Sequence, residues 1–314
     1  MPVILGIDTS NYTTSAALAD AQTGKIVRSV KQLLPVKEGQ LGLRQSDAVF
    51  HHTAALPRIV EQVYEGLDTQ TVAVAVSDRP SEKEHSYMPC FLAGVNAAAV
   101  SAQALQVPLF RTSHQVGHVL ACLYGCERLQ ALQGDFICFH VSGGTTDALS
   151  VHPENGEMHV QRIARSLDLK AGQAVDRIGA QMGLPFPAGK ALDALARQSE
   201  KRYAQKAMLK GADCSLSGLE NLARAMLKKG ESEEDCARFT FDYLANTLKA
   251  MSLKLQEQYG HLPLFFAGGV MSNSIIKERL SDELGAAFCP PAYSADNAAG
   301  IAYYGYMKWN SLKN

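Results

Sequence analysis

The sequence predicts an α/β protein in which two similar lobes are built from one repeated strand–loop–strand unit. The first copy spans residues 3–29 and the second spans residues 136–163. Each copy has a short apolar strand, a polar loop rich in Ser and Thr, a second strand, and then a Thr-Gly or Asn-Gly turn. Such turns between apolar runs are typical of β-hairpins. A duplication of this kind indicates two lobes with a cleft between them.

The composition is that of an ordinary globular protein. The chain has 314 residues, a length sufficient for two domains. Of these residues 46% are hydrophobic and 19% are charged. Its 30 basic and 31 acidic residues leave a net charge near −1, so no overall attraction to nucleic acid or anionic membranes is expected. The densest basic region predicts either a solvated helix face or a nucleic-acid surface; its members are Lys201, Arg202, Lys206, Lys210, Arg224, Lys228 and Lys229.

Cysteine usage and the N-terminal residues predict a cytoplasmic protein. The seven cysteines are scattered without a CxxC pair, which indicates reduced thiols. The chain enters a strand at once, so no signal peptide is expected, and no apolar run approaches the about 18 residues of a membrane span. Cys90 precedes a helix, where it is either a thiolate favoured by the helix dipole or a small buried side chain.

Asp8 ends the first predicted strand of the first lobe. In a Ser/Thr-rich loop, such a carboxylate either holds a metal or a water, or bonds to its own turn. The following elements are expected in this order: a helix over 48–66 capped by Ser46, a strand over 71–76, a polar loop over 77–90, a helix over 91–105 and a strand over 107–111.

Two histidines open the next helix, which Thr112 and Ser113 are expected to cap. His114 and His118 are four residues apart, so they lie on one helical face about 5–6 Å apart at Cβ. A metal needs this spacing, although an HxxxH also occurs in helices without a metal. Asp296 precedes the last predicted helix, where it either caps that helix or supplies a third ligand.

The second lobe begins with a buried strand over 136–140. The loop that follows, Ser142 to Thr145, contains two glycines and is either a phosphate cradle or an ordinary hairpin turn. Asp176 lies on a helix before a Pro/Gly-rich loop, which suits either a ribose site or a plain helix and turn. A long helix over 237–259 and a strand over 263–267 lead to the stretch Gly268 to Asn273, which opens another helix and forms a candidate anion site.

With these loops in this order, the sequence resembles the superfamily of actin, heat-shock ATPases and sugar kinases (ASKHA), whose fold is a two-lobed, duplicated ribonuclease H-like α/β fold. More closely, it resembles the TsaD family, also called Gcp or the glycoprotease family, which makes threonylcarbamoyladenosine in tRNA. The resemblance implies an N-terminal lobe over 1–118, with the last helix (about 297–314) packed back on it. The C-terminal lobe is then 119–296, with a helical insertion at about 165–230.

The resemblance also implies a ligand set. The family's HxxxH and DNAA segments match His114, His118 and Asp296, and two imidazoles with one carboxylate suit Fe(II), with Zn or Mg as alternatives. ATP or an acyl-adenylate is the implied second ligand. The residues implied for nucleotide binding are His140, Val141, Ser142, Gly143, Gly144, Thr145, Asp176, Gly189 and Asn273.

Three segments depart from the family pattern. An acidic TSCDDT loop is replaced by Thr9-Ser10-Asn11-Tyr12-Thr13-Thr14, a Gly/Pro-rich loop by residues 77–90, and the Glu of GEAFDK by Gln173. The metal and nucleotide residues are therefore well matched. The part expected to handle the acyl group and its acceptor is not.

The implied activity is that of a (threonyl)carbamoyl transferase acting from an adenylate onto adenosine N6 of tRNA, with Asp8 or His85 as candidate base. Two alternatives are an ATP-dependent carbamoyl transferase with another acceptor, and a non-catalytic nucleotide-binding partner of a true synthase. A protease is not expected, because the chain has neither a Ser/His/Asp order nor HExxH. The expected partners are tRNA and other subunits of a tRNA-modification complex, without a membrane.

Overall fold

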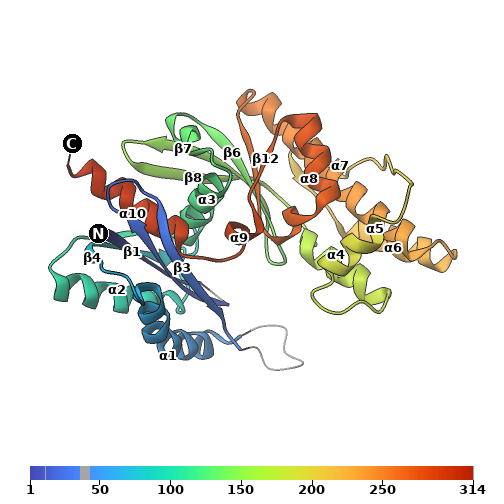
Figure 1. Ribbon diagram of the computed structural model, residues 1–314. Coiled ribbons are helices and arrows are strands. Elements are labelled where there is room, and N and C mark those ends of the chain that lie inside the picture. Colours follow the sequence, from blue (N-terminus) through green and yellow to red (C-terminus); the bar gives the residue numbers. More distant parts are fainter. Residues whose placement is uncertain (11, 36–42, 314) are drawn as a thin grey trace. The chain divides into compact units, whose positions relative to one another are not determined.

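The computed structural model describes residues 1–10, 12–35 and 43–313 (Figure 1), so Asn11 of the altered first loop lies outside the described residues. The chain divides into two compact units. Unit 1 comprises residues 1–129, 153–160 and 295–314, and unit 2 comprises residues 130–152 and 161–294. Unit 1 extends past the expected boundary at 118 because the helix that opens at His114 continues to Gly125.

Unit 1 is built on a five-stranded sheet with the order β3-β2-β1-β4-β5. β1 to β3 are antiparallel neighbours, while β4 is parallel to β1 and β5 to β4. Helices α1 and α2 cover one face, and α10 covers the other with α3 beside it (Figure 1). The elements are β1 (Pro2–Ser10), β2 (Thr13–Asp20), β3 (Ile26–Leu33), α1 (Gln45–Tyr64), β4 (Gln70–Arg79), α2 (Phe91–Leu105), β5 (Leu109–Ser113), α3 (His114–Gly125) and α10 (Ala299–Ser311). The short 3₁₀ helix η1 (Leu129–Gln133) follows α3 and leads into unit 2.

Strand β1 places its side chains alternately on the two faces of this sheet. Leu5 and Ile7 pack into the core under α1 and α2. Gly6 faces α10, where a β-carbon would lie 2.7 Å from the Cα of Ala302, so the absence of a side chain lets the helix approach. Asp8 is the next residue on the face of Gly6. The alternation therefore directs its carboxylate toward the side of the sheet where α3 and α10 lie.

Unit 2 repeats this sheet. Its order is β12-β11-β6-β7-β8, in which β6 is antiparallel to β7 and parallel to β11, as β1 is to β2 and β4. The duplication predicted from the two hairpins is confirmed. The elements are β6 (Phe136–Val141), β7 (Thr146–Glu154), β8 (Glu157–Arg165), α4 (Ala171–Gln181), α5 (Gly189–Ala196), β9 (Leu209–Lys210), β10 (Asp213–Cys214), α6 (Ser217–Lys228), α7 (Glu233–Tyr259), β11 (Leu264–Ala267), η2 (Gly269–Ser272), α8 (Ser274–Leu284), β12 (Ala287–Phe288) and α9 (Pro291–Ser294).

Helix α7 is the centre of the unit 2 core. Leu244, Leu248, Met251 and Leu255 recur at helical spacing and are all buried with the side chains of β6 and β11. Each such side chain contributes about 1.5–3 kcal/mol of hydrophobic stabilisation. α5, α6 and α8 pack against the same helix (Figure 1). This core fixes the loops that surround the pocket described below.

The expected Ser46 cap of the first helix is wrong, whereas the expected opening of a helix by Gly268 to Asn273 is confirmed. Helix α1 begins at Gln45, with Arg44 at its N-cap position and no side-chain cap, so Ser46 lies inside the first turn, where its hydroxyl donates to Asp47. The Gln45 carboxamide accepts a hydrogen bond from the Cys90 N–H at 3.2 Å. The residues after Gly268 form only the short 3₁₀ helix η2. Helix α8 begins at Ser274, where Asn273 caps it by accepting a hydrogen bond from the Ile276 N–H. No helix among the described residues is both long and apolar enough to cross a bilayer.

Candidate metal centre and nucleotide pocket

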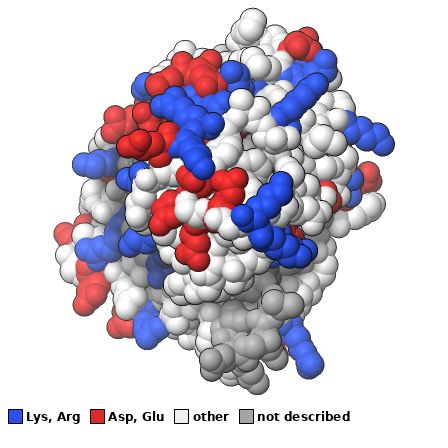
Figure 2. Space-filling view, turned by 90° about the vertical axis from the view of Figure 1, so that its right-hand side faces the viewer, with Lys and Arg blue, Asp and Glu red and all other residues white. Residues whose placement is uncertain are grey.

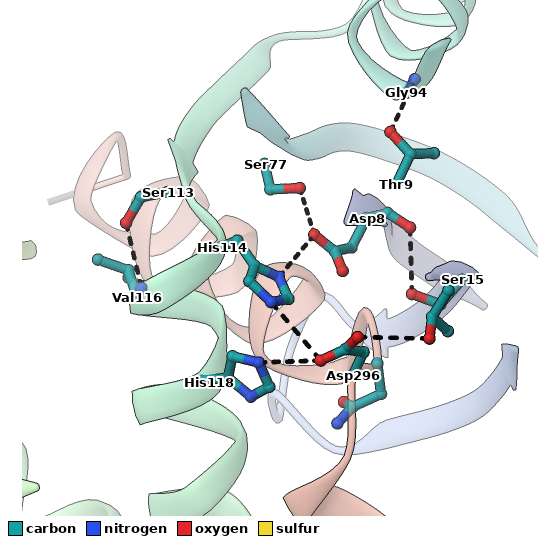
Figure 3. Close-up of polar contacts among 12 residues, drawn as sticks. Asp8, Thr9, Ser15, Ser77, Gly94, Ser113, His114, Val116, His118 and Asp296 are labelled. Carbon is teal, nitrogen blue, oxygen red and sulfur yellow. Dashed lines mark hydrogen bonds and ion pairs between the residues drawn. The ribbon is translucent and has the colours of Figure 1, made fainter. Parts of the chain in front are cut away.

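Three side chains of unit 1 converge to form a candidate metal centre. His114 and His118 lie one turn apart on α3, and Asp296 lies three residues before α10 (Figure 3). The Nε2 atoms of His114 and His118 are 3.6 Å and 3.2 Å from the same oxygen, Oδ1 of Asp296. One potential ligand atom from each residue lies within 4.8 Å of the other two. At the start of α10 the Ala299 N–H donates a hydrogen bond to Asn297 and not to Asp296, whose carboxylate faces the histidines.

This donor set fits a divalent metal ion. Ligand atoms at about 2.0–2.2 Å from one ion are themselves about 3–3.5 Å apart, which is close to both Nε2–Oδ1 distances. Two imidazoles and one carboxylate leave further coordination positions open, the arrangement typical of metals that act on a substrate. His118 is almost fully buried, while Asp296 keeps 31% of its side chain exposed. The cluster is therefore held by the protein yet open on the side of Asp296.

Asp8 contacts His114 at Nδ1, the ring nitrogen that does not face Asp296. Its Oδ1 is 3.0 Å from Nδ1 of His114 and accepts a short hydrogen bond from the Ser77 hydroxyl (Figure 3). The Asp8 side chain is completely buried, and its Oδ2 has no hydrogen-bond partner among the described residues. Thr13 donates a hydrogen bond of 3.4 Å to Oδ2 of Asp296, on the other side of the cluster.

The electrostatics of the cluster favour ionised groups. Burial disfavours the imidazolium, but the carboxylates of Asp8 and Asp296 outweigh burial and raise the pKa of His114 to about 10. Burial also opposes ionisation of Asp296, but His114 and His118 hold the pKa of that carboxyl well below its usual range. A bound cation would take the place of the imidazolium proton, because metal ligands must be deprotonated.

The two candidate bases lie in opposite environments. Asp8 is sealed from solvent, with Oδ1 engaged by His114 and Ser77. The His85 side chain is 91% exposed in the loop over 77–90, where its Nε2 lies 3.4 Å from the Glu84 carboxylate. A general base must be held within reach of the proton that it removes. The role of general base at Asp8 or His85 stays a prediction.

A separate pocket of about 570 Å³ lies within unit 2. Four of the residues implied for nucleotide binding line it: Gly143, Asp176, Gly189 and Asn273. Asp176 accepts a hydrogen bond of 2.8 Å from the Ala188 N–H, which fastens the Pro/Gly-rich loop to α4. Phe186 and Phe241 add aromatic surface to the lining. Apolar walls with a few convergent polar groups are typical of small-molecule sites.

The other implied residues belong to the strand and turn beside Gly143. His140 and Val141 end strand β6, and Ser142 and Thr145 close the turn by two hydrogen bonds, of 2.7 Å and 3.2 Å. Gly144 is exposed within that turn. The loop is thus a hairpin turn, and the Gly172 N–H donates a hydrogen bond of 3.1 Å to its Ser142 carbonyl. This bond fixes the turn against the start of α4.

Sequence reasoning missed two residues. Ser77 reaches Asp8 because β1 and β4 are parallel neighbours, with Ile7 paired to Val76. Asp193, on α5, lines the pocket and accepts hydrogen bonds from the Asn273 amide and the Ser274 hydroxyl. Asp193 follows Gly189 by four residues on α5, so the two lie on one face of that helix. This spacing could have predicted that Asp193 lines the same pocket as Gly189.

The predicted basic region is partly neutralised. Lys201 Nζ is 2.6 Å from Asp235, and Arg224 Nη2 is 2.7 Å from Glu220. Figure 2, the face toward the right of Figure 1, shows acidic and basic side chains interspersed. Interspersed charges of both signs weaken the local field. The solvated helix face is therefore the better supported of the two interpretations for these pairs.

The sequence matches a known family along most of its length. The family model described as TsaD, tRNA N6-adenosine threonylcarbamoyltransferase, matches residues 28–303. The tRNA N6-adenosine threonylcarbamoyltransferase of Streptococcus pneumoniae serotype 2 (strain D39) is 30% identical to this chain. The alignment is 323 positions long and covers 98% of this chain and 92% of that protein. The protein of the same name from Streptococcus gordonii (strain Challis) is also 30% identical, with the same coverage.

Solved structures agree on the fold. The protein is similar to HypF of T. kodakarensis, with a TM-score of 0.65 and 11% identity over 98% of this chain and 48% of that one. It is also similar to component A of the (R)-2-hydroxyglutaryl-CoA dehydratase of Acidaminococcus fermentans, with a TM-score of 0.58 and 18% identity over 99% of this chain and 100% of that one. The fold is thus the duplicated actin-like α/β fold. With the match along most of its length, the chain belongs to the TsaD family of tRNA N6-adenosine threonylcarbamoyltransferases.

Proposed function

We propose that this protein transfers a threonylcarbamoyl group from its adenylate to N6 of an adenosine in tRNA. The observation that carries the proposal is the convergence of His114, His118 and Asp296 in a chain that matches the TsaD family from residue 28 to 303. A protein that only bound nucleotide would have no use for a partly open two-imidazole, one-carboxylate set. The tRNA substrate implies work in the cytoplasm, together with other subunits of a tRNA-modification complex.

In the proposed reaction, N6 of adenosine attacks the carbonyl carbon of the threonylcarbamoyl group. The new C–N bond forms, the bond from that carbon to the phosphate oxygen breaks, AMP leaves with the electron pair, and N6 gives up one proton. A divalent ion held by His114, His118 and Asp296 would supply Lewis-acid polarisation and charge stabilisation for this step. Fe(II) suits the ligands, with Zn and Mg as alternatives.

The chain's own residues bind and orient the reactants. Asp176 and Asn273 offer polar contacts to a nucleoside in the unit 2 pocket, where Gly143 and Gly189 allow close approach of the backbone. Phe186 is 85% exposed beside this pocket and offers an aromatic face to the base. Binding of the adenylate would place its carbonyl for attack, and this orientation is itself a large part of the rate gain expected in acyl transfer.

The test is the threonylcarbamoyladenosine content of tRNA, measured by mass spectrometry in cells that lack this gene and carry a plasmid copy. We expect the wild-type gene to restore the nucleoside, and His114→Ala and His118→Ala to fail. His159→Ala is the matched control, because that side chain is 63% exposed and outside the cluster. Normal levels in the deletion strain would show that another protein makes the nucleoside and would overturn the proposed acceptor.

A second measurement keeps the activity separate from growth effects. The purified protein is incubated with the adenylate and unmodified tRNA, with any partner subunits added back, and the release of AMP is followed. Loss of AMP release in both histidine variants, but not in His159→Ala, supports the proposal. Equal release by all four proteins would mean that the cluster is not part of the reaction.

A further inference from the structure

We propose that Asp8 is a positioning residue of the metal centre, which, with the help of Ser77, holds His114 so that its Nε2 faces the ion. This inference rests on the metal centre of the proposed function, but not on the identity of the acceptor. It assigns to Asp8 a role through His114 in place of a direct part in the chemistry.

The imidazole of His114 has two nitrogens, and the structure distinguishes them. Nδ1 lies 3.0 Å from Asp8, while Nε2 points to Asp296 at 3.6 Å. A hydrogen bond from Nδ1–H to a carboxylate fixes the tautomer, so the lone pair is on Nε2 when the ring is neutral. Histidine ligands of metals commonly donate their second N–H to a carboxylate in this manner, which orients the ring and raises its basicity.

The carboxylate of Asp8 is itself oriented by Ser77. The Ser77 hydroxyl donates to the same Oδ1 that faces His114, and the side chain of Ser77 is buried. A fully buried carboxylate is costly unless it is paired with positive charge. Its Oδ2 has no partner among the described residues, so the pairing depends on the His114 side. The cost of burying the Asp8 carboxylate is therefore offset mainly by the His114 ring. The ring offsets this cost best when it carries positive charge, as it would with a cation bound at Nε2.

The backbone makes this arrangement rigid. Asp8 and Ser77 lie on the neighbouring parallel strands β1 and β4, and β2 pairs with β1 on its other side. Ring placement is thus set by the centre of a five-stranded sheet. By contrast, Asp296 lies in a segment between two helices, and its side chain is 31% exposed.

The experiment measures metal affinity of the purified protein with Co(II) alone, by chelator competition and by the visible absorption of the bound ion. No tRNA or adenylate is present. We expect Asp8→Asn and Asp8→Ala to weaken Co(II) binding about 10- to 100-fold, the usual effect of losing the carboxylate behind a histidine ligand. Ser77→Ala should weaken it several-fold. The Co(II) spectrum of each variant should shift, a signature that loss of stability alone would not produce.

Ser15→Ala is the matched control. Ser15 and Ser77 are both fully buried serines that donate to Asp8, but Ser15 reaches the main-chain carbonyl and only Ser77 reaches the carboxylate. Ser15→Ala should leave Co(II) affinity within about twofold of wild type. If Asp8→Ala fails to fold by circular dichroism, Asp8→Asn and Ser77→Ala carry the test. Affinities and spectra of these two that match wild type would overturn the inference.

The outcomes separate this inference from the proposed function. If the Asp8 variants lose Co(II) but wild-type protein makes no threonylcarbamoyladenosine, the positioning role stands and the acceptor is wrong. If Asp8→Asn binds Co(II) as wild type does and the histidine variants lose the modified nucleoside, the function stands and the positioning role is wrong. A wild-type protein that binds no Co(II) would overturn the metal centre itself.

Discussion

Gly300, the second residue of α10, packs on the main chain of Gly117 in α3. A β-carbon at position 300 would overlap the Gly117 carbonyl oxygen and lie 2.8 Å from the Ala121 nitrogen. The backbones of α3 and α10 are therefore in direct contact where the helices cross. Gly117 lies next to His118, and Gly300 lies four residues after Asp296. The separation of the metal ligands depends on this contact.

We expect Gly300→Ala to destabilise the protein by about 2–3 kcal/mol or more, because neither backbone can move aside cheaply. Co(II) affinity should fall as well, since the added methyl group pushes Asp296 away from α3. Urea unfolding and Co(II) titration measure the two effects. Gly134→Ala is the control, because its β-carbon would meet nothing within 4 Å. Equal stability of Gly300→Ala and wild type would contradict the close crossing.

His52 predicts a loss of stability in acid. This histidine of α1 is fully buried, with Nδ1 2.8 Å from the Thr14 hydroxyl, and burial lowers the pKa of His52 to about 4. The unfolded chain therefore binds a proton from about pH 6.5 downward while the folded protein stays neutral, so stability falls between pH 6.5 and pH 4. The expected contribution is about 2–3 kcal/mol over that range.

The measurement is the free energy of unfolding in urea at pH 7.5 and pH 4.5, for wild type and for His52→Gln. The variant should lose less stability on acidification than wild type does. His159→Gln, changed at an exposed position, should behave like wild type. A pH dependence of His52→Gln as steep as that of wild type would show that another group is responsible.

Cys90 should be unreactive in the native protein. It is fully buried, and burial, with a smaller contribution from the Asp8 charge, raises the pKa of Cys90 to about 11. The interpretation as a small buried side chain is thus supported over the thiolate. In iodoacetamide labelling read by peptide mass spectrometry, we expect Cys126, the one cysteine that is not buried, to react first. Rapid native labelling of Cys90 would contradict its burial.

Gly172 should be required for nucleotide binding. A β-carbon there would lie 2.6 Å from the nitrogen and Cα of Gly143, which lines the pocket. We expect Gly172→Ala to displace the turn over Ser142 to Thr145 and to weaken AMP binding about tenfold by calorimetry, with the fold retained. Gly218→Ala, whose β-carbon would meet the Tyr243 hydroxyl at 3.8 Å, is the control. If the AMP affinity of Gly172→Ala equals that of wild type, the turn over Ser142 to Thr145 is not part of the nucleotide site.

Most of the fold could be predicted from local patterns. The repeated hairpins implied the duplicated sheet, and Ser113 caps α3 as its position indicated, by accepting a hydrogen bond from the Val116 N–H. The i, i+4 spacing of His114 and His118 is a local property and was readable. The cap at Ser46 was wrong, because α1 begins at Gln45 and Ser46 lies inside its first turn.

The groups around the ligands could not be predicted in this way. Asp8, Ser77 and His114 come together only through the register of two parallel strands and the docking of α3. No spacing in the sequence encodes that register. Asp193 was missed for a similar reason: its link to Asn273 joins α5 to the start of α8. Pattern reasoning identified the candidate ligands, which the structure brings together, while long-range packing decides which groups surround them.

The position of Asp296 next to α10 has a consequence for biosynthesis. The ribosome delivers Asp8 and both histidines early, but the third ligand emerges only after the whole of unit 2 has been translated. A nascent chain interrupted before Asp296 has two of three ligands and no α10 over strand β1. Such a chain cannot retain a cation with the affinity of the finished protein. At the proposed metal centre, metal loading would therefore follow the translation of Asp296 and would mark chains whose synthesis has passed this point.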